Sequence, residues 1–262
     1  MNIILIYMLI TGFATMIGAI AGLGGGVIIK PLFDMIGAHD AITIGVYSSF
    51  AVFSMAIVST YKQIKNGIKI NKKVVLFIGL GSLIGGYIGE LSLNYVNAKF
   101  NSYFSINGIQ ASLLFIVLTL ILIYTLNKNK FPSLRVQSPV IIFAVGAFLG
   151  IVSVFLGIGG GPLNIATITI IFSFDIKDTV VYSIITILAA QIYKLGKILL
   201  LDGFANYDTK PLIYIIISAI IGGYLGAVIN NKLRDDKVQK IYILTIVSLM
   251  GISFLNAWNA FV

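Results

Sequence analysis

Apolar runs of about 20 residues recur along nearly the whole chain, and this pattern limits the possible folds more than any other feature. A helix of about 20 residues is long enough to cross the ~30 Å hydrocarbon core of a bilayer. The chain has 262 residues, of which 58% are hydrophobic and only 10% are charged. No soluble domain of this size needs so much apolar surface. We therefore expect an all-α polytopic protein of the cell membrane, a multi-pass integral membrane protein.

Two of the apolar runs are interrupted by three consecutive glycines. The first interruption reads A-G-L-G-G-G-V-I-I-K-P, from Ala21 to Pro31, and the second reads L-G-I-G-G-G-P-L-N-I, from Leu156 to Ile165. Glycine breaks helices, and irregular backbone survives in a bilayer only where protein buries it or where it lines a cavity. Breaks at corresponding places in two halves of a hydrophobic chain indicate a transport site.

The two runs belong to a duplication of the whole chain. A shift of 135 residues superimposes Gly24-Gly25-Gly26 on Gly159-Gly160-Gly161, Asp40 on Asp175, and Tyr47-Ser48 on Tyr182-Ser183. Further along, I-G-G-Y-I-G from Ile84 matches I-G-G-Y-L-G from Ile221 at a shift of 137. We therefore divide the chain into a first membrane repeat, 1–130, and a second, 131–262, with a polar joint at 127–133. Together the repeats are expected to form one transmembrane domain.

Each half is predicted to contain four long helices and one short helix that follows the glycine run. The long segments are 3–22, 41–61, 74–91 and 105–126 in the first half, and 139–158, 179–199, 211–229 and 239–258 in the second. The short segments are 26–36 and 162–174. A helix of that length measures about 17–20 Å, too short to cross the core untilted. The short segments are therefore predicted to be re-entrant or half-length helices.

The distribution of Lys and Arg favours a chain that reverses direction at each glycine run. Loops on the cytoplasmic side carry an excess of these residues. Without Lys30, they divide 11 against 6 if the runs do not reverse the chain, and 13 against 4 if they do. In the second case the minority side holds only Lys99, Lys194, Lys197 and Lys210. Reversal places both termini outside and makes the two halves inverted repeats.

Composition excludes several classes of function. The net charge of +9 is accounted for by positive loops, whereas nucleic-acid binding needs a clustered soluble surface, so no nucleic-acid partner is expected. Cysteine is absent and His39 is the only histidine, which leaves no thiolate chemistry and no multi-histidine metal site. We expect no cofactor, no metal and no catalytic residue, because P-loop and nucleophile-elbow motifs are also missing. His39 is predicted to lie solvated in a short loop.

The six glycines of the two runs, Gly24–Gly26 and Gly159–Gly161, are candidate binding residues for a small anion. A helix that restarts after Gly26 exposes N–H groups in its first turn, and its dipole is positive there. Pro162 suits the first position of the second helix. Both helix starts, brought to one central cavity, would form an anion site. The alternative is close helix packing, which is the role expected of glycines spaced by four, namely Gly81, Gly85 and Gly89, with Ser218, Gly222 and Gly226.

Five side chains are candidate members of the same site. Lys30, one turn into the first short helix, can meet an anion or snorkel to the interface. Asn164 is polar inside a buried membrane segment and can donate an amide hydrogen bond. Ser48 and Ser183 hold equivalent positions and can bind a ligand or join helices. Gln191 lies mid-span with no polar counterpart in the first half.

At these residues the chain resembles the TauE/SafE sulfite exporter family of membrane permeases. G-L-G-G-G-V-I-I-K-P, from Gly22 to Pro31, matches the family's G-x-G-G-G-x-x-x-x-P motif. The second copy departs from it with an early Pro162 and with Asn164, and Lys30 stands where the family usually has an apolar residue. The resemblance covers nearly the full chain. It implies transport of small anions, often sulfur-containing, such as sulfite, thiosulfate or organosulfonates.

The function expected from the residues and the resemblance is that of a secondary transporter working by alternating access. Its substrate would be a small anion, a sulfur oxyanion or an organosulfonate. An anion channel using the same cavity is one alternative, and a membrane binding or assembly subunit without transport is another. A coupling proton or cation and a homo-oligomer are further partners that the sequence leaves open, beside the lipid bilayer itself.

Overall fold

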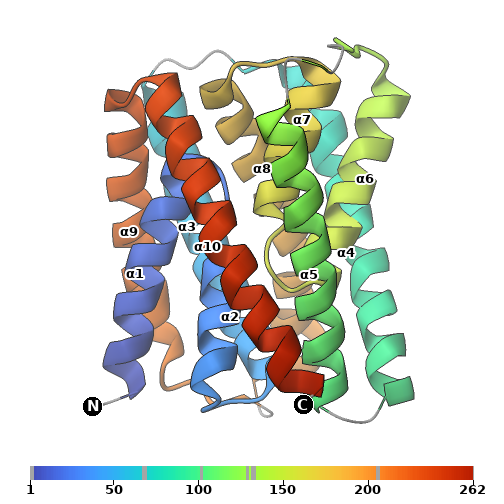
Figure 1. The fold of residues 1–262 in the computed structure, drawn as a ribbon, viewed down its shortest axis with the longest axis vertical. Helices are drawn as coiled ribbons and strands as arrows, with labels where there is room; N and C mark the ends of the chain where they lie inside the picture. Colours follow the sequence, from blue (N-terminus) through green and yellow to red (C-terminus); the bar gives the residue numbers. More distant parts are fainter. Residues whose placement is uncertain are drawn as a thin grey trace.

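The protein is a bundle of helices (Figure 1). The computed structural model describes residues 3–66, 70–100, 103–127, 130, 134–204 and 207–261. In order, the helices are α1 (Ile3–Ala21), α2 (Gly26–Ile36), α3 (Ala41–Lys65), α4 (Lys72–Phe100), α5 (Tyr103–Leu126), α6 (Pro139–Phe155), α7 (Gly161–Phe172), α8 (Ile176–Lys197), α9 (Leu212–Lys232) and α10 (Asp235–Phe261). A π-helical turn, η2 (Ile198–Asp202), extends α8. The prediction of an all-α fold is confirmed for the residues described.

The membrane-spanning character of the helices is confirmed. Seven of them are long and apolar enough to cross a bilayer, whereas α6, at 17 residues, and α7, at 12, are shorter. Large apolar side chains point outward from the bundle, among them Leu120 at 62% exposure and Leu244 at 68%. A surface of this kind suits lipid rather than water. The chain is a multi-pass integral membrane protein.

The helices of the two halves are interleaved. Helix α4 packs along α6, and α9 packs along α1 in the equivalent way. Gly81, Gly85 and Gly89 of α4 face the α6 backbone, and Gly222 and Gly226 of α9 face the α1 backbone, so closely that an added methyl group would overlap it. The packing role predicted for these glycines is therefore confirmed.

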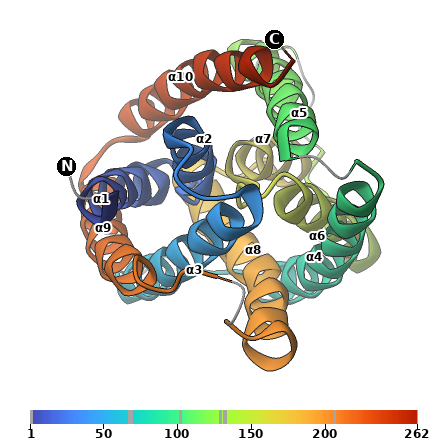
Figure 2. The same cartoon turned by 90° about the horizontal axis from the view of Figure 1, so that it is seen from below.

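The two short helices lie inside the bundle. Figure 2 shows α2 and α7 surrounded by α1, α9, α4, α6, α5 and α10. Helix α2 lies in the lower half of the molecule as drawn in Figure 1 and α7 in the upper half, while both termini lie at the lower end. Most of the predicted joint, 128–129 and 131–133, lies outside the described residues. The arrangement puts the start of each short helix in the interior.

Candidate functional site

Both glycine runs interrupt the helices, as predicted. Helix α1 ends at Ala21 and α2 begins at Gly26, while α6 ends at Phe155 and α7 begins at Gly161. The linking glycines have positive φ angles: 72°, 78° and 71° at Gly22, Gly24 and Gly25, and 66°, 75° and 75° at Gly157, Gly159 and Gly160. Side-chain-bearing residues rarely adopt this left-handed region. The two loops therefore share one backbone shape at positions 135 residues apart.

The two glycine loops pack directly on each other. A methyl group on Gly26 would lie 2.7 Å from the carbonyl oxygen of Ile158, and one on Gly161 would overlap the backbone of Leu23. These are equivalent contacts, since Leu23 and Ile158 also differ by 135 positions. The loops are thus brought to one place in the interior, as the sequence predicts. Close packing of the two loops requires glycine here, and so does the approach of a ligand to the backbone. The packing role and the binding role of these glycines are therefore compatible.

The starts of α2 and α7 lie at this contact. The first turn of α2 is closed by the N–H of Ile28, which donates to the Gly25 carbonyl at 2.9 Å, and Asn164 donates likewise to Gly160 at 3.0 Å. Pro162 stands in the first turn of α7, as predicted. The positive ends of two helix dipoles therefore face the same buried region.

The two equivalent serines differ in their bonding. Ser183 donates its hydroxyl proton to the Gly22 carbonyl at 2.6 Å and so ties α8 to the first loop. The Ser48 hydroxyl lies 2.9 Å from where a methyl group on Gly26 would stand, at the start of α2. Both side chains are fully buried. Of the two roles weighed for each, helix joining describes Ser183, whereas Ser48 is placed beside a helix start.

Lys30 is buried and paired with a carboxylate. Its side chain is 5% exposed, and its ammonium Nζ lies 2.9 Å from Oδ2 of Asp34, one turn further along α2. Its stem passes Gly157 of the second loop, where a methyl group would lie 3.1 Å from Cε. The alternative that Lys30 snorkels to the interface is wrong, because its side chain is buried beside a cavity that is lined by α2, α5, α10 and the second glycine loop. Asp34 was not among the predicted residues, although the i, i+4 spacing signals such a pair.

A small cavity of about 20 Å³ adjoins the Lys30–Asp34 pair. Oδ1 of Asp34, Oε1 of Gln110 and Oγ of Ser253 are buried there without a hydrogen-bond partner in the described part of the chain. Gln110 donates its amide to the Phe155 carbonyl at 2.6 Å, and Asn256 donates to that of Pro31 at 3.2 Å. These α5 and α10 residues contact α2 and α6 over long sequence separations, which the sequence alone does not reveal.

Asn164 and Gln191 are both buried and incompletely bonded. Asn164 donates to the Ser183 carbonyl at 3.5 Å, and its Oδ1 has no partner among the described residues. That oxygen lies beside the second loop, 3.0 Å from a methyl position on Gly160. Oε1 of Gln191 also lacks a described partner, but the residue of α8 that touches Gly24 is Ile187, one turn earlier. Asn164 is therefore beside the glycine loops, and Gln191 lies beyond them.

His39 is not solvated, and this prediction is wrong. Its ring is only 15% exposed, and its Nδ1 lies 2.9 Å from the Tyr7 hydroxyl. Its Nε2 lies 3.6 Å from Oδ2 of Asp208, in the segment before α9. The loop is short, but α1 and α3 flank it and supply aromatic partners, so the imidazole packs instead of facing water.

Comparison with known proteins gives one consistent answer. No solved structure matches the chain significantly. The probable membrane transporter protein MJ0441 of Methanocaldococcus jannaschii is 28% identical over 95% of this chain and 94% of its own length. The probable membrane transporter protein YunE of Bacillus subtilis is 24% identical over 88% and 90%.

The family model described as sulfite exporter TauE/SafE matches residues 7–254, nearly the whole chain. The match includes both glycine loops, both short helices and the Lys30–Asp34 pair. The expectation drawn from the G-x-G-G-G motif is confirmed at the level of the family. This protein belongs to the TauE/SafE sulfite exporter family of membrane transporters.

Proposed function

We propose that the protein is a secondary transporter that carries a small anion through the membrane at the contact of its two glycine loops. One observation supports this most strongly: two helices begin inside the bundle, at facing loops whose left-handed glycines recur at a spacing of 135 residues. Two positive helix ends in a low-dielectric interior attract an anion. Gly24, Gly25, Gly26, Gly159, Gly160 and Gly161 would supply the backbone of the site.

The side chains around the loops support an anionic rather than a neutral substrate. Lys30 is the cation nearest to the loops that the described contacts include, and Asn164 carries an amide beside them. An anion that approaches Lys30 competes with Asp34 for the ammonium. We place any coupling of the anion to a proton or a cation at this ion pair.

The substrate class we propose is a sulfur oxyanion or an organosulfonate. It rests on the family's description as sulfite exporters, and the positive helix ends suit such a group chemically. Ser48 and Asn164 would provide hydroxyl and amide contacts. Gln191, buried but beyond the loops, would act only in a state where α8 has moved.

We further propose that the halves are inverted repeats that rock against each other. Helix α1 begins at the lower end of the molecule, and α6 begins at the upper end (Figure 1). Helix α9 packs on α1 as α4 packs on α6, which is the relation expected of two repeats exchanged by a twofold axis in the membrane plane. Broken helices at the centre of inverted repeats fit alternating access.

The test is transport by the purified full chain in liposomes. Labelled sulfite, thiosulfate, sulfoacetate and simple carboxylates would be offered one at a time. A carrier exchanges labelled for unlabelled substrate across the membrane and saturates, whereas a channel conducts without counterflow. Saturable counterflow of a sulfur anion is the expected result. Failure of every anion to move would favour an assembly subunit and overturn the proposal.

A further inference from the structure

The two ends of the molecule can be compared position by position, because the duplication pairs their residues. A shift of 135 relates Tyr7 to Ile142, His39 to Phe174 and Tyr47 to Tyr182, and a shift of 137 relates Asp208 to Asn71. At each end the tyrosine hydroxyl bonds to the backbone of the equivalent partner residue, as a donor at one end and as an acceptor at the other. The Tyr47 hydroxyl donates to the Asp208 carbonyl at 2.5 Å, and the Asn71 N–H donates to the Tyr182 hydroxyl at 2.8 Å. The equivalence is therefore structural as well as sequential.

At the lower end, Tyr7, His39, Tyr47 and Asp208 form a connected cluster, which we name the lower cluster. Tyr7 is fully buried and stacks on Phe33, with ring centroids 3.9 Å apart. Its hydroxyl lies 2.9 Å from the His39 imidazole, which in turn faces the Asp208 carboxylate at 3.6 Å. The Tyr47 ring packs edge-on against the Tyr7 and His39 rings, with centroids 6.1 and 5.3 Å apart. Helices α1 and α3 and the segment before α9 are thereby linked across this end.

At the upper end, the equivalent positions border a pocket of about 380 Å³, which we name the upper mouth. Ile142 replaces Tyr7 and has no hydroxyl to form a bridge. Phe174 replaces His39 and stacks on Tyr182, with centroids 4.7 Å apart, instead of linking elements across the end. The nine residues that line the upper mouth are Asn71, Lys73, Val74, Arg135, Val136, Gln137, Ile142, Phe172 and Phe174.

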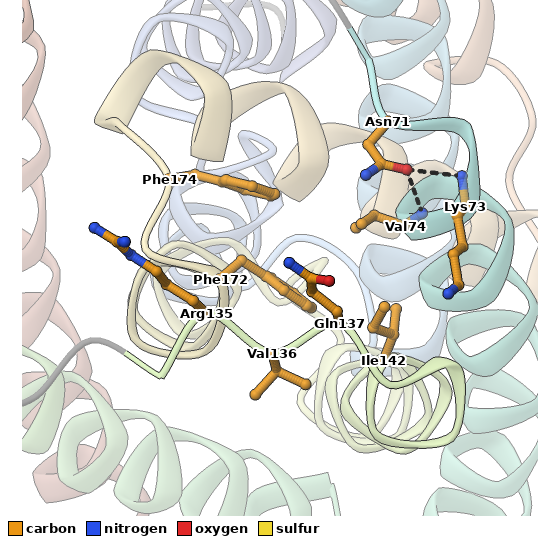
Figure 3. Close-up of a pocket in the computed structure, with 9 residues that line it drawn as sticks. All are labelled: Asn71, Lys73, Val74, Arg135, Val136, Gln137, Ile142, Phe172 and Phe174. Carbon is orange, nitrogen blue, oxygen red and sulfur yellow. Dashed lines mark hydrogen bonds between the residues drawn. The ribbon is translucent and has the colours of Figure 1, made fainter.

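The lining of the upper mouth suits an anion with a short apolar part. Figure 3 shows Arg135 on one side and Asn71 and Lys73 on the other, with Phe172 and Gln137 between them. None of the nine lining residues is acidic. The segment that carries Arg135 is held by the Val136 N–H, which donates to the Ile171 carbonyl at 2.9 Å. The cationic and amide groups suit the sulfonate group of a small organosulfonate, and the aromatic rings suit its apolar part.

We propose that the upper mouth is the open entrance through which a small organic anion reaches the glycine loops, and that the lower cluster closes the equivalent entrance at the other end. This inference rests on the transport function proposed above and adds the residues that admit the substrate and those that exclude it. In a state of alternating access that is open to one side, one of the two equivalent ends is open and the other is closed.

The upper mouth can be tested with a cysteine reporter, because the natural chain has no cysteine. Phe174→Cys in the purified full chain would be modified by a neutral methanethiosulfonate and by its anionic sulfonatoethyl analogue. We expect Lys73→Gln to lower the ratio of anionic to neutral rates about threefold to tenfold, since a unit charge near the thiol is lost. Lys210→Gln, the equivalent change at the lower end, is the matched control and should leave the ratio unchanged.

Three outcomes show how this inference and the proposed function stand relative to each other. If the ratio falls and ethanesulfonate slows modification, both the anionic entrance and the proposed sulfonate substrate are supported. If the ratio falls but only inorganic anions protect, the anionic entrance stands and the sulfonate class fails. An unchanged ratio in Lys73→Gln, seen also with Gln137→Cys as the reporter, overturns the proposal that the upper mouth is the entrance for the anion.

The lower cluster is tested with the same reporter. Tyr7→Phe keeps the ring on Phe33 and removes the hydroxyl that meets His39. If the cluster closes the lower end, weakening it populates the opposite state and slows modification of Phe174→Cys by up to about fivefold, the effect of one hydrogen bond. Tyr61→Phe removes an exposed hydroxyl and serves as the control. Unchanged or faster modification in Tyr7→Phe contradicts the closing role.

Discussion

The two glycine loops are alike in backbone and unlike in the side chains that follow them. Their φ angles agree within a few degrees at each pair of positions, yet α2 carries Lys30 and Asp34 where α7 carries Ile165 and Thr169. Ile165 is 2% exposed and packs against Gly22. Thr169 donates to the Thr179 hydroxyl at 3.4 Å. Duplication has preserved the shape of the loops, while the charge has been confined to one of them.

This difference separates two requirements of the site. The fold needs two matched loops, because each fills the space left by the other's missing side chains. Recognition of an anion needs only one buried cation. A second Lys opposite Lys30 would repel the Lys30 ammonium in the low-dielectric interior. The loops should therefore respond alike to changes in backbone and differently to changes in charge.

The largest effect is expected where the loops touch. Gly26→Ala and Gly161→Ala should each destabilise the protein by about 1–3 kcal/mol and reduce transport at least tenfold, because the added methyl group meets the opposing backbone. Thermal midpoints in detergent and uptake in liposomes measure the two effects. Gly196→Ala, where a methyl group meets nothing within 4 Å, is the control. If only one loop variant has an effect, the loops are not equivalent.

A change of charge should affect the two short helices differently. Lys30→Met should raise KM for the anion about tenfold or more, since a charge-assisted hydrogen bond is lost. Ile165→Met, the same new residue at the equivalent position, should change KM little. Because Lys30→Met also strands Asp34, the double variant with Asp34→Asn should recover stability while KM stays high. Recovery of KM in the double variant would assign Lys30 a purely structural role.

Substitution of the equivalent serines, Ser48 and Ser183, should affect stability and anion affinity separately. Ser183→Ala removes the hydrogen bond to the Gly22 carbonyl and should lower stability by about 1 kcal/mol. Ser48→Ala should leave the thermal midpoint close to that of the natural protein and weaken anion affinity about threefold, if its hydroxyl serves the ligand at the start of α2. Equal effects of the two changes on both quantities would show that the serines have one shared role.

The helices and their breaks could be predicted from the sequence because hydrophobic length and glycine runs are local signals. The ends of the helices were predicted less accurately. Helix α4 runs to Phe100 rather than to residue 91, and α10 begins at Asp235 rather than at 239. Apolar runs mark only the part of a helix that lies in lipid, and polar turns at the ends are stabilised by backbone bonding.

The candidate site was predicted only in part. The glycines, Lys30, Ser48, Asn164 and Ser183 are brought close to the loop contact, whereas Asp34 and Gln110 were missed and His39 was placed wrongly in solvent. Asp34 has a local signal in its spacing from Lys30. Gln110 does not, because its bond to the Phe155 carbonyl spans 45 residues of the chain and depends on α5 lying beside the end of α6. Such contacts follow from tertiary packing, for which one sequence contains no pattern.

The smallest expected effect concerns the equivalent N-cap residues of α3 and α8. Burial acts to raise the pKa of Asp40, but hydrogen bonds from the Thr43 hydroxyl and from the N–H groups of Thr43 and Ile42 outweigh it and hold that pKa below its ordinary value. Asp175 caps α8 without a side-chain bond. Asp40→Ala should therefore lower stability by about 1 kcal/mol at neutral pH, and Asp175→Ala should have little effect.

The pH dependence of that difference has a definite sign. A carboxyl whose pKa is lowered on folding stabilises the folded state above its ordinary pKa, near 4, and loses this contribution as pH falls through the lowered value. The gap in thermal midpoint between the natural chain and Asp40→Ala should thus persist at pH 5–7 and close below about pH 3. A gap that stays open in acid would mean that Asp40 acts through packing rather than as a charged cap. In that case the charge at the N-cap would not distinguish α3 from α8.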